Sequence, residues 1–203
     1  MVNKYAAIVP PFVIFVLSLV VYITLAGKLT FTFETHPANY FSHLSYAFLQ
    51  GKLYLISPLW DHDLSLFNNK YYMYWGPSPV LLIIPIVYFF GLEVSDKLYT
   101  AIYASLSPVL IYLILSQLKQ IGIFVSTIKK ILISLFFAFG TVHLYLSADG
   151  GVWFTSQIFS TLYILISMLF ILKYFTQVKI EYLTLGGIFF GLSFIGRPTF
   201  IFY

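Results

Sequence analysis

Long apolar runs, nearly all without a charged side chain, are the feature that most constrains the fold of this chain. Six runs follow one another, at residues 5–26, 80–92, 98–118, 131–148, 150–172 and from 182 onward. About 20 apolar residues in a helix cross the roughly 30 Å hydrocarbon core of a bilayer. The runs therefore predict an integral membrane protein, an all-α polytopic bundle of about six transmembrane helices in which the 80–92 run is short.

Composition excludes several classes of protein. Charged residues make up 9% of the chain and hydrophobic residues 60%, whereas a soluble domain has about 25% charged residues. The 11 basic and 7 acidic residues are scattered along the chain, so they form no stripe for nucleic acid. The chain has no cysteine, which excludes disulfides and thiol nucleophiles. Motifs of nucleotide hydrolases, zinc proteases and serine hydrolases are also missing.

Residues 1–203 are expected to form a single transmembrane domain, and residues 27–79 are its only long loop. The loop holds three of the seven acids and three of the four histidines, which are Glu34, Asp61, Asp63, His36, His43 and His62. A loop of this length is usually functional, so polar chemistry is expected here. The chain ends in an apolar run, so we expect it to be the N-terminal part of a larger protein.

Within this loop, residues 37–50 show the periodicity of an amphipathic helix. The apolar positions that share one face are Tyr40, Phe41, Leu44, Ala47 and Phe48, while the polar positions are Asn39, His43, Tyr46 and Gln50. Thr35 is a candidate cap and Gly51 follows the end. The pattern predicts a helix that lies in the membrane interface.

The lysines conflict with a simple topology. If every run crosses the membrane and the N-terminus is inside, Lys119, Lys129 and Lys130 fall outside, against the tendency of basic loops to stay inside. Either the 80–92 run enters and returns without crossing, or packing overrides the charge tendency. Both alternatives keep loop 27–79 on the outer, extracytoplasmic face.

Three groups of residues are candidates for chemistry. Glu34, Asp61 or Asp63 could act as a general base, and the last two with His62 could bind a divalent cation, unless they are solvated loop residues. Lys70 and the tyrosines at 71–74 suit a phosphate group or an aromatic belt. The only arginine, Arg197, lies in an apolar run, where it either binds phosphate or marks a helix end.

The order of a single run, a loop with an interfacial helix and an aromatic-proline re-entry resembles the GT-C membrane glycosyltransferases. Among them, the protein mannosyltransferases and the aminoarabinose transferase of lipid A are most similar. The matching stretches are 39–51, 71–79 and 191–198, the last with Gly196-Arg197-Pro198. The resemblance implies an inverting hexosyl or pentosyl transfer from a polyprenyl-phosphate sugar to an acceptor on the outer face. It implies a base among Glu34, Asp61 and Asp63.

The resemblance also implies substrate-binding residues, namely His36, Lys70, Tyr72, Tyr74 and Arg197. Family members carry acids shortly before the tyrosine at position 40, where this chain has Thr35 to Asn39, so the identity of the base stays open. No metal ligand is assigned. The expected partners are the lipid-linked donor and membrane lipid, without nucleic acid, in a bacterial or archaeal cell membrane. The alternatives are a transporter or flippase of a lipid-linked substrate, or a non-catalytic assembly subunit.

Overall fold

The computed structural model describes residues 4–58 and 60–199, and these residues are mostly helical. The elements in chain order are α1 (Lys4–Ala26), α2 (Tyr40–Leu49), β1 (Leu64–Phe67), β2 (Lys70–Met73), α3 (Val80–Phe90), η1 (Gly91–Glu93), α4 (Asp96–Ala104), α5 (Leu106–Gln117), η2 (Leu118–Ile121), α6 (Thr127–Phe139), α7 (His143–Asp149), α8 (Gly151–Gln177) and α9 (Ile180–Gly196).

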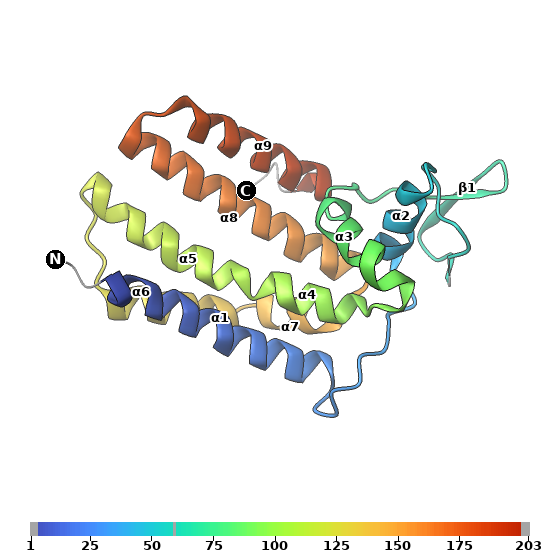
Figure 1. Ribbon diagram of the computed structural model, residues 1–203, viewed down its shortest axis with the longest axis horizontal. Helices are drawn as coiled ribbons and strands as arrows, with labels where there is room; N and C mark the ends of the chain where they lie inside the picture. Colours follow the sequence, from blue (N-terminus) through green and yellow to red (C-terminus); the bar gives the residue numbers. More distant parts are fainter. Residues whose placement is uncertain (1–3, 59, 200–203) are drawn as a thin grey trace.

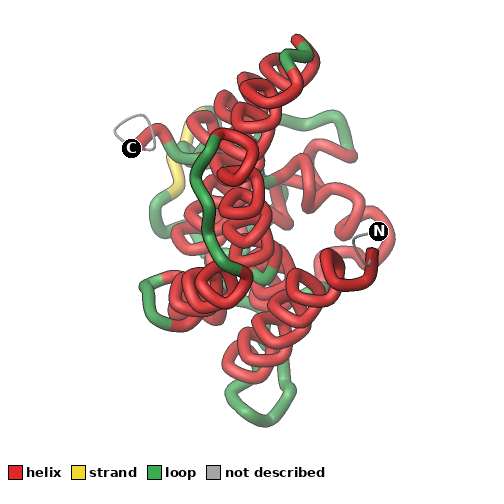
Figure 2. Tube along the Cα trace, turned by 90° about the vertical axis from the view of Figure 1, so that its left-hand side faces the viewer, coloured by secondary structure: helices red, strands yellow, loops and turns green. Residues whose placement is uncertain are grey.

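The long helices lie side by side and the loop 27–79 caps one end of them. In Figure 1, α1, α4 with α5, α8 and α9 run along the length of the molecule, and α2, α3 and the β1–β2 hairpin gather at the right. We call this the loop end. Figure 2 views the bundle from the opposite end, where the N-terminus lies.

Fewer helices than predicted are long enough to cross a bilayer. Within the described residues three helices qualify, Ile8–Ala26, Asp96–Ile121 and Gly151–Gln177, and a fourth does so if α6 and α7 count as one span. The helices α3 and α9 are apolar but shorter. The structure therefore supports a helical membrane protein with several long apolar helices, and by length three or four of the about six predicted spans qualify among the described residues.

A bend divides the predicted 131–148 span. Helices α6 and α7 meet at an angle of 52°, and the chain leaves the first helix at Gly140. A Cβ atom at Gly140 would lie 2.7 Å from the ring of Phe136. His143 then begins α7, with its Nε2 3.1 Å from the carbonyl oxygen of Ala104. Glycine and this interhelical contact account for the kink.

Helix α3 does not run along the bundle, so it stays at the loop end (Figure 1). It is followed by α4 and α5, which run from the loop end to the opposite end. The connections that carry Lys119, Lys129 and Lys130 therefore lie opposite to loop 27–79. This arrangement agrees with the alternative in which the 80–92 run enters and returns.

Helix α2 confirms the predicted helix but corrects its surroundings. It begins at Tyr40 and not at Pro37, and seven of its ten residues are buried. Some of its polar residues are buried as well, because Ser42 Oγ lies 3.2 Å from Tyr99 Oη and this hydroxyl donates to Asn39 Oδ1 at 2.9 Å. Tyr46 and Gln50, the other end of the predicted polar face, are exposed, so only part of that face is packed into the protein.

The β1–β2 hairpin corrects the all-α prediction. Its antiparallel strands pair Leu64 with Met73 and Phe67 with Lys70. Asn68 and Asn69 form the turn with φ angles of 48° and 57°, the left-handed values that a two-residue hairpin turn requires. Asparagine tolerates these angles better than most residues, and this pair was the signal in the sequence.

Candidate functional site

Trp153 joins the loop to the end of α9. It lies in the first turn of α8, and its indole Nε1 donates to Asp63 Oδ2 at 3.1 Å. Its carbonyl oxygen accepts a hydrogen bond from Arg197 Nη1 at 3.1 Å, and the same guanidinium reaches Ser156 Oγ at 3.4 Å. One residue of α8 therefore brings together an acid from the loop and the only arginine of the chain.

Aromatic and histidine rings surround this connection. Trp60 stacks on His62 with ring centroids 4.7 Å apart. The ring of Trp153 lies edge-on to Trp60 at 6.3 Å and to His62 at 6.5 Å. His36 approaches Trp153 from another segment of the loop, at 6.1 Å. We call Trp60, His62, Trp153 and His36 the ring cluster, an indole-rich surface beside a carboxylate.

Asp96 fixes the start of α8 against the loop. Its Oδ1 accepts from the backbone N–H of His36 at 2.8 Å, and its Oδ2 accepts from that of Gly151 at 2.7 Å. The residue is 1% exposed. A carboxylate at a helix N-terminus satisfies free N–H groups and is stabilised by the helix dipole. Asp96 therefore sets where Trp153 lies relative to His36.

Gly151 permits this close approach. Its φ angle is +74°, and a Cβ atom there would lie 3.1 Å from Nδ1 of His36. Any other residue would meet both the backbone strain of a left-handed angle and the imidazole ring. The glycine pair at 150 and 151 is thus required by the contact between loop and helix.

The re-entry segment packs directly on the end of α9. A Cβ atom at Gly76 would lie 1.4 Å from the carbonyl oxygen of Ile195, so only glycine fits. Ser78, two residues further on, contacts the same helix end, because its Oγ would lie 2.5 Å from a Cβ atom at Gly196. The ring of Trp75 lies 5.6 Å from Arg197 Cζ. Two stretches that carry the family resemblance, 71–79 and 191–198, are therefore in contact.

Two tyrosine hydroxyls face the loop carboxylates. Burial raises the pKa of Tyr40 to about 12, and the negative charges of Asp63 and Asp61 contribute to this rise. Burial also raises the pKa of Tyr74, again with a contribution from Asp63. Tyr40 Oη donates to the carbonyl oxygen of His62. Both hydroxyls therefore stay protonated at neutral pH, and Tyr40 holds the backbone between the two aspartates.

The structure brings together three of the eight predicted site residues, because Asp63, His36 and Arg197 all contact Trp153. Asp61 and Tyr74 are connected with this group electrostatically, through the pKa of Tyr40, to which their charges contribute together with that of Asp63.

The other three predicted residues lie apart from Trp153. The side chain of Glu34 is exposed, and its carbonyl oxygen accepts from Ser95 Oγ at 3.2 Å. Lys70 Nζ lies 4.5 Å from the ring centroid of Tyr54, and Tyr72 lies 6.3 Å from the same ring. Tyr71 and Met73, which alternate with Lys70 and Tyr72 along β2, pack on the core instead. Lys70 and Tyr72 thus occupy the opposite face of the hairpin.

A groove between α8 and α9 begins at this site. Its lining residues are Gln157, Ile164, Ser167, Met168, Ile171, Phe190, Arg197 and Thr199, and its volume is about 790 Å³. The α8 residues in this lining span 14 positions, which corresponds to roughly 21 Å of helix. The groove therefore has an arginine at one end and mostly apolar walls along its length.

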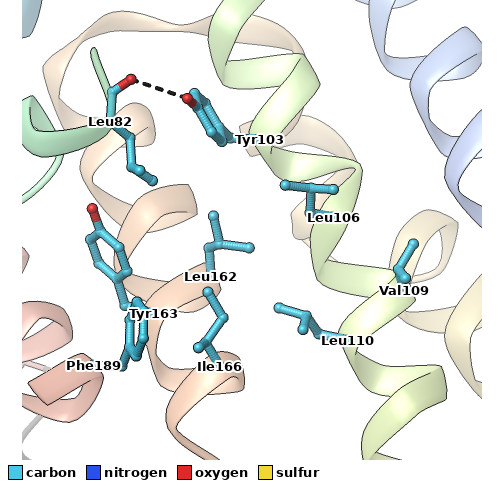
Figure 3. Close-up of a pocket in the computed structure, with 9 residues that line it drawn as sticks. All are labelled: Leu82, Tyr103, Leu106, Val109, Leu110, Leu162, Tyr163, Ile166 and Phe189. Atoms are coloured by element: carbon cyan, nitrogen blue, oxygen red, sulfur yellow. Dashed lines mark hydrogen bonds between the residues drawn. The ribbon is translucent and has the colours of Figure 1, made fainter. Parts of the chain in front are cut away.

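A second cavity lies on the other side of α9, between α3, α4, α5 and α8. Its volume is about 340 Å³ and its lining residues carry no charge. Figure 3 shows leucine and aromatic side chains around it, with the hydroxyl of Tyr103 bonded to the carbonyl oxygen of Leu82 at 3.0 Å. Phe189 faces this cavity and the neighbouring Phe190 faces the groove. Of these two cavities, the groove is the one whose described lining includes a cationic side chain, that of Arg197.

The loop does not assemble a set of metal ligands. No group of three or more His, Asp or Glu side chains that could hold a metal occurs among residues 4–58 and 60–199. Of the residues that the sequence suggested for a cation site, His62 and Asp63 form a pair, with Nε2 of His62 3.6 Å from Oδ1 of Asp63. The geometry therefore supports an acid–histidine pair and not a metal centre.

Two residues that organise the site, Trp153 and Asp96, were not predicted. Each lies in the first turn of a helix outside loop 27–79, and the search for polar chemistry in the sequence pointed to that loop. The available signal was the pair Gly150-Gly151 before an apolar run, because consecutive glycines at a helix start often mark a close backbone approach.

Comparison with protein-family models found no match, and comparisons with curated proteins and with solved structures found none either.

Proposed function

We propose that the chain is a membrane glycosyltransferase, or a part of one, that transfers a sugar from a polyprenyl-phosphate donor. The observation that carries the proposal is the junction at Trp153, whose indole binds Asp63 and whose carbonyl oxygen binds Arg197, a residue that lines one end of a long, mostly apolar groove. A lipid-linked sugar phosphate needs the same three features, which are a path for its tail, a cation for its phosphate and a base for the acceptor.

The groove between α8 and α9 suits the donor. Its apolar wall would take the prenyl chain, and its open side would let the chain enter from the bilayer. Arg197 lies at the end where the phosphate would be. Its planar guanidinium can contact two phosphate oxygens at once, which stabilises the negative charge that develops on the leaving group.

Asp63 is the best placed of the three candidate bases. It is 33% exposed and is held by the indole of Trp153, so it is both oriented and accessible. In the proposed step the acceptor hydroxyl gives its proton to Asp63, and its oxygen bonds to the anomeric carbon. The bond from that carbon to the phosphate oxygen breaks, and polyprenyl phosphate leaves on Arg197. The ring cluster offers flat apolar faces for a sugar beside the base.

The test is turnover of a polyprenyl-phosphate hexose or pentose by the full chain in lipid vesicles, followed as release of polyprenyl phosphate. We expect Asp63→Asn to lower turnover by about 10²-fold or more, the usual contribution of a general base. We expect Arg197→Gln to lower it by a similar factor. The exposed acid Glu93, which lies outside the site, provides Glu93→Gln as the matched control with turnover like the wild type.

Product analysis separates this proposal from the transport alternative. A transporter would move the intact donor across the vesicle membrane, whereas the proposed enzyme cleaves it. Full turnover in both the Asp63 and Arg197 variants, or translocation of intact donor without cleavage, would contradict the proposed function.

A further inference from the structure

The end of the bundle opposite to the loop carries most of the positive charge. It consists of the start of α1, the α5–α6 connection and the α8–α9 connection (Figure 1). Six of the eleven basic residues belong to it, namely Lys4, Lys119, Lys129, Lys130, Lys173 and Lys179, with one acid, Glu181. We call it the basic end. The loop end has five basic and six acidic residues, so the charges are +5 and −1 and together give the net +4.

Exposed apolar side chains alternate with these lysines. Phe124 is 76% exposed, Ile128 70% and Val178 75%, and each lies within a few positions of a lysine in sequence. Surfaces of this mixed kind are typical of the membrane interface, where apolar groups enter the lipid and lysine head groups stay at the level of the phosphates.

Three lysine head groups of the basic end, those of Lys119, Lys130 and Lys173, lie near aromatic rings, and Lys130 also donates to Ser116 Oγ. Lys119 Nζ lies 5.9 Å from the ring centroid of Phe124, and Lys173 Nζ lies 5.6 Å from that of Phe170. The single ion pair among the described residues is the one between His62 and Asp63 at the loop end. A ring contact leaves the N–H donors of an ammonium group available to oxygen acceptors, so these head groups suit an external anion.

We propose that the basic end is a contact surface for the phosphate groups of anionic phospholipids. The contact places the basic end at the more anionic leaflet and the loop end at the opposite face of the membrane. Helix η2 contacts α8, so the two connections form one continuous surface and not two separate basic loops. This proposal does not depend on the proposed catalytic activity.

The test compares spin-labelled phosphatidylglycerol with spin-labelled phosphatidylcholine around the full chain in reconstituted vesicles. We expect the protein to prefer the anionic lipid by about fivefold at low ionic strength, the factor expected when a basic residue meets an anionic surface. Because 1 M salt reduces the Debye length to about 3 Å, the preference should then approach one. A wild-type protein without preference, or with a preference insensitive to salt, would overturn the proposal.

Matched variants locate the surface. The exposed lysines of the basic end give the triple variant Lys119→Gln, Lys129→Gln and Lys179→Gln, which should lower the preference below about twofold. The control removes the same charge from the loop end, with Lys28→Gln, Lys52→Gln and Lys97→Gln, and should keep the preference of the wild type. An equal loss in both variants would refute a surface confined to the basic end.

Discussion

Among single residues, Trp153 stands out because its side chain and its backbone bind different partners. The indole N–H holds a loop carboxylate, and the backbone carbonyl holds Arg197. The side chain can therefore be changed without removing the backbone contact. This separation makes the contribution of the carboxylate contact measurable by itself.

Trp153→Phe keeps an aromatic ring but removes the hydrogen bond to Asp63. A hydrogen bond to a charged group contributes about 1.5–3 kcal/mol, and solvent screening at the partly exposed Asp63 places the effect at the low end. We expect turnover of the lipid-linked donor to fall roughly tenfold. In an Asp63→Asn background the same change should cause little further loss. Additive losses in the double variant would contradict a role through Asp63.

Gly151→Ala tests the junction between loop and helix by stability. The substitution places a Cβ atom against His36 at a φ of +74°, so we expect unfolding to become easier by at least about 1 kcal/mol. Gly187→Ala is the control, because Gly187 lies inside α9 with nothing within 4 Å of its Cβ position. Thermal unfolding in detergent should show a lower midpoint for the first variant and an equal or higher midpoint for the second.

The sequence predicted which reactive residues the site contains better than it predicted which residues hold them in place. Asp63, His36 and Arg197 were predictable because charged groups are scarce in this chain and the few in unusual places stand out. Trp153 and Asp96 were not, because their roles depend on which helix starts meet in space. Lys70 and Tyr72 were placed in the site because their side chains suit a phosphate group and because of the family resemblance, but strand alternation turns them to the other face of the hairpin.

At the scale of elements, α2 shows how far a hydrophobic pattern can predict a helix. Periodicity predicted the helix correctly, but it predicted one buried face, and Asn39 and His43 of the polar face are buried too. Hydrogen bonds such as the one from Tyr99 to Asn39 make this burial possible. These partners come from α4, about 60 positions away, and local sequence does not reveal them.

His43 on α2 predicts a loss of stability in acid. Burial lowers its pKa below the ordinary value of 6.5, and the carbonyl of Ile56 opposes this only in part. The unfolded chain therefore takes up a proton at a higher pH than the folded chain. Its contribution to stability is complete above pH 6.5 and is lost as the pH falls through the lowered pKa.

The measurement is the unfolding midpoint of the wild type and of His43→Gln between pH 7.5 and pH 5. The wild type should lose more stability than the variant over this interval, because glutamine does not titrate. Parallel curves for the two proteins would show that His43 does not contribute to the acid sensitivity.

At the scale of the whole molecule, the short α3 stays at the loop end and does not run toward the basic end. Because α3 stays with the loop, α4 and α5 together are the next element to run the full length of the bundle. The apolar runs alone did not decide between this arrangement and six crossings, since length predicts where a helix can cross and not which way it lies.

The lack of cysteine in the chain allows each end to be labelled separately. Leu53 at the loop end and Phe124 at the basic end are each 76% exposed. In intact cells, Leu53→Cys should react with a membrane-impermeant maleimide, and Phe124→Cys should react only after the membrane is opened. Reaction of both from the same side would contradict a passage of α4 and α5 across the membrane.

The three tryptophans of the chain all belong to the site, where Trp60 and Trp153 adjoin Asp63 and Trp75 lies beside Arg197. Tryptophan emission, excited selectively over that of the 17 tyrosines, therefore originates at this location. A quenching titration with the proposed lipid-linked donor would then report its binding at the loop end without any chemical modification of the chain.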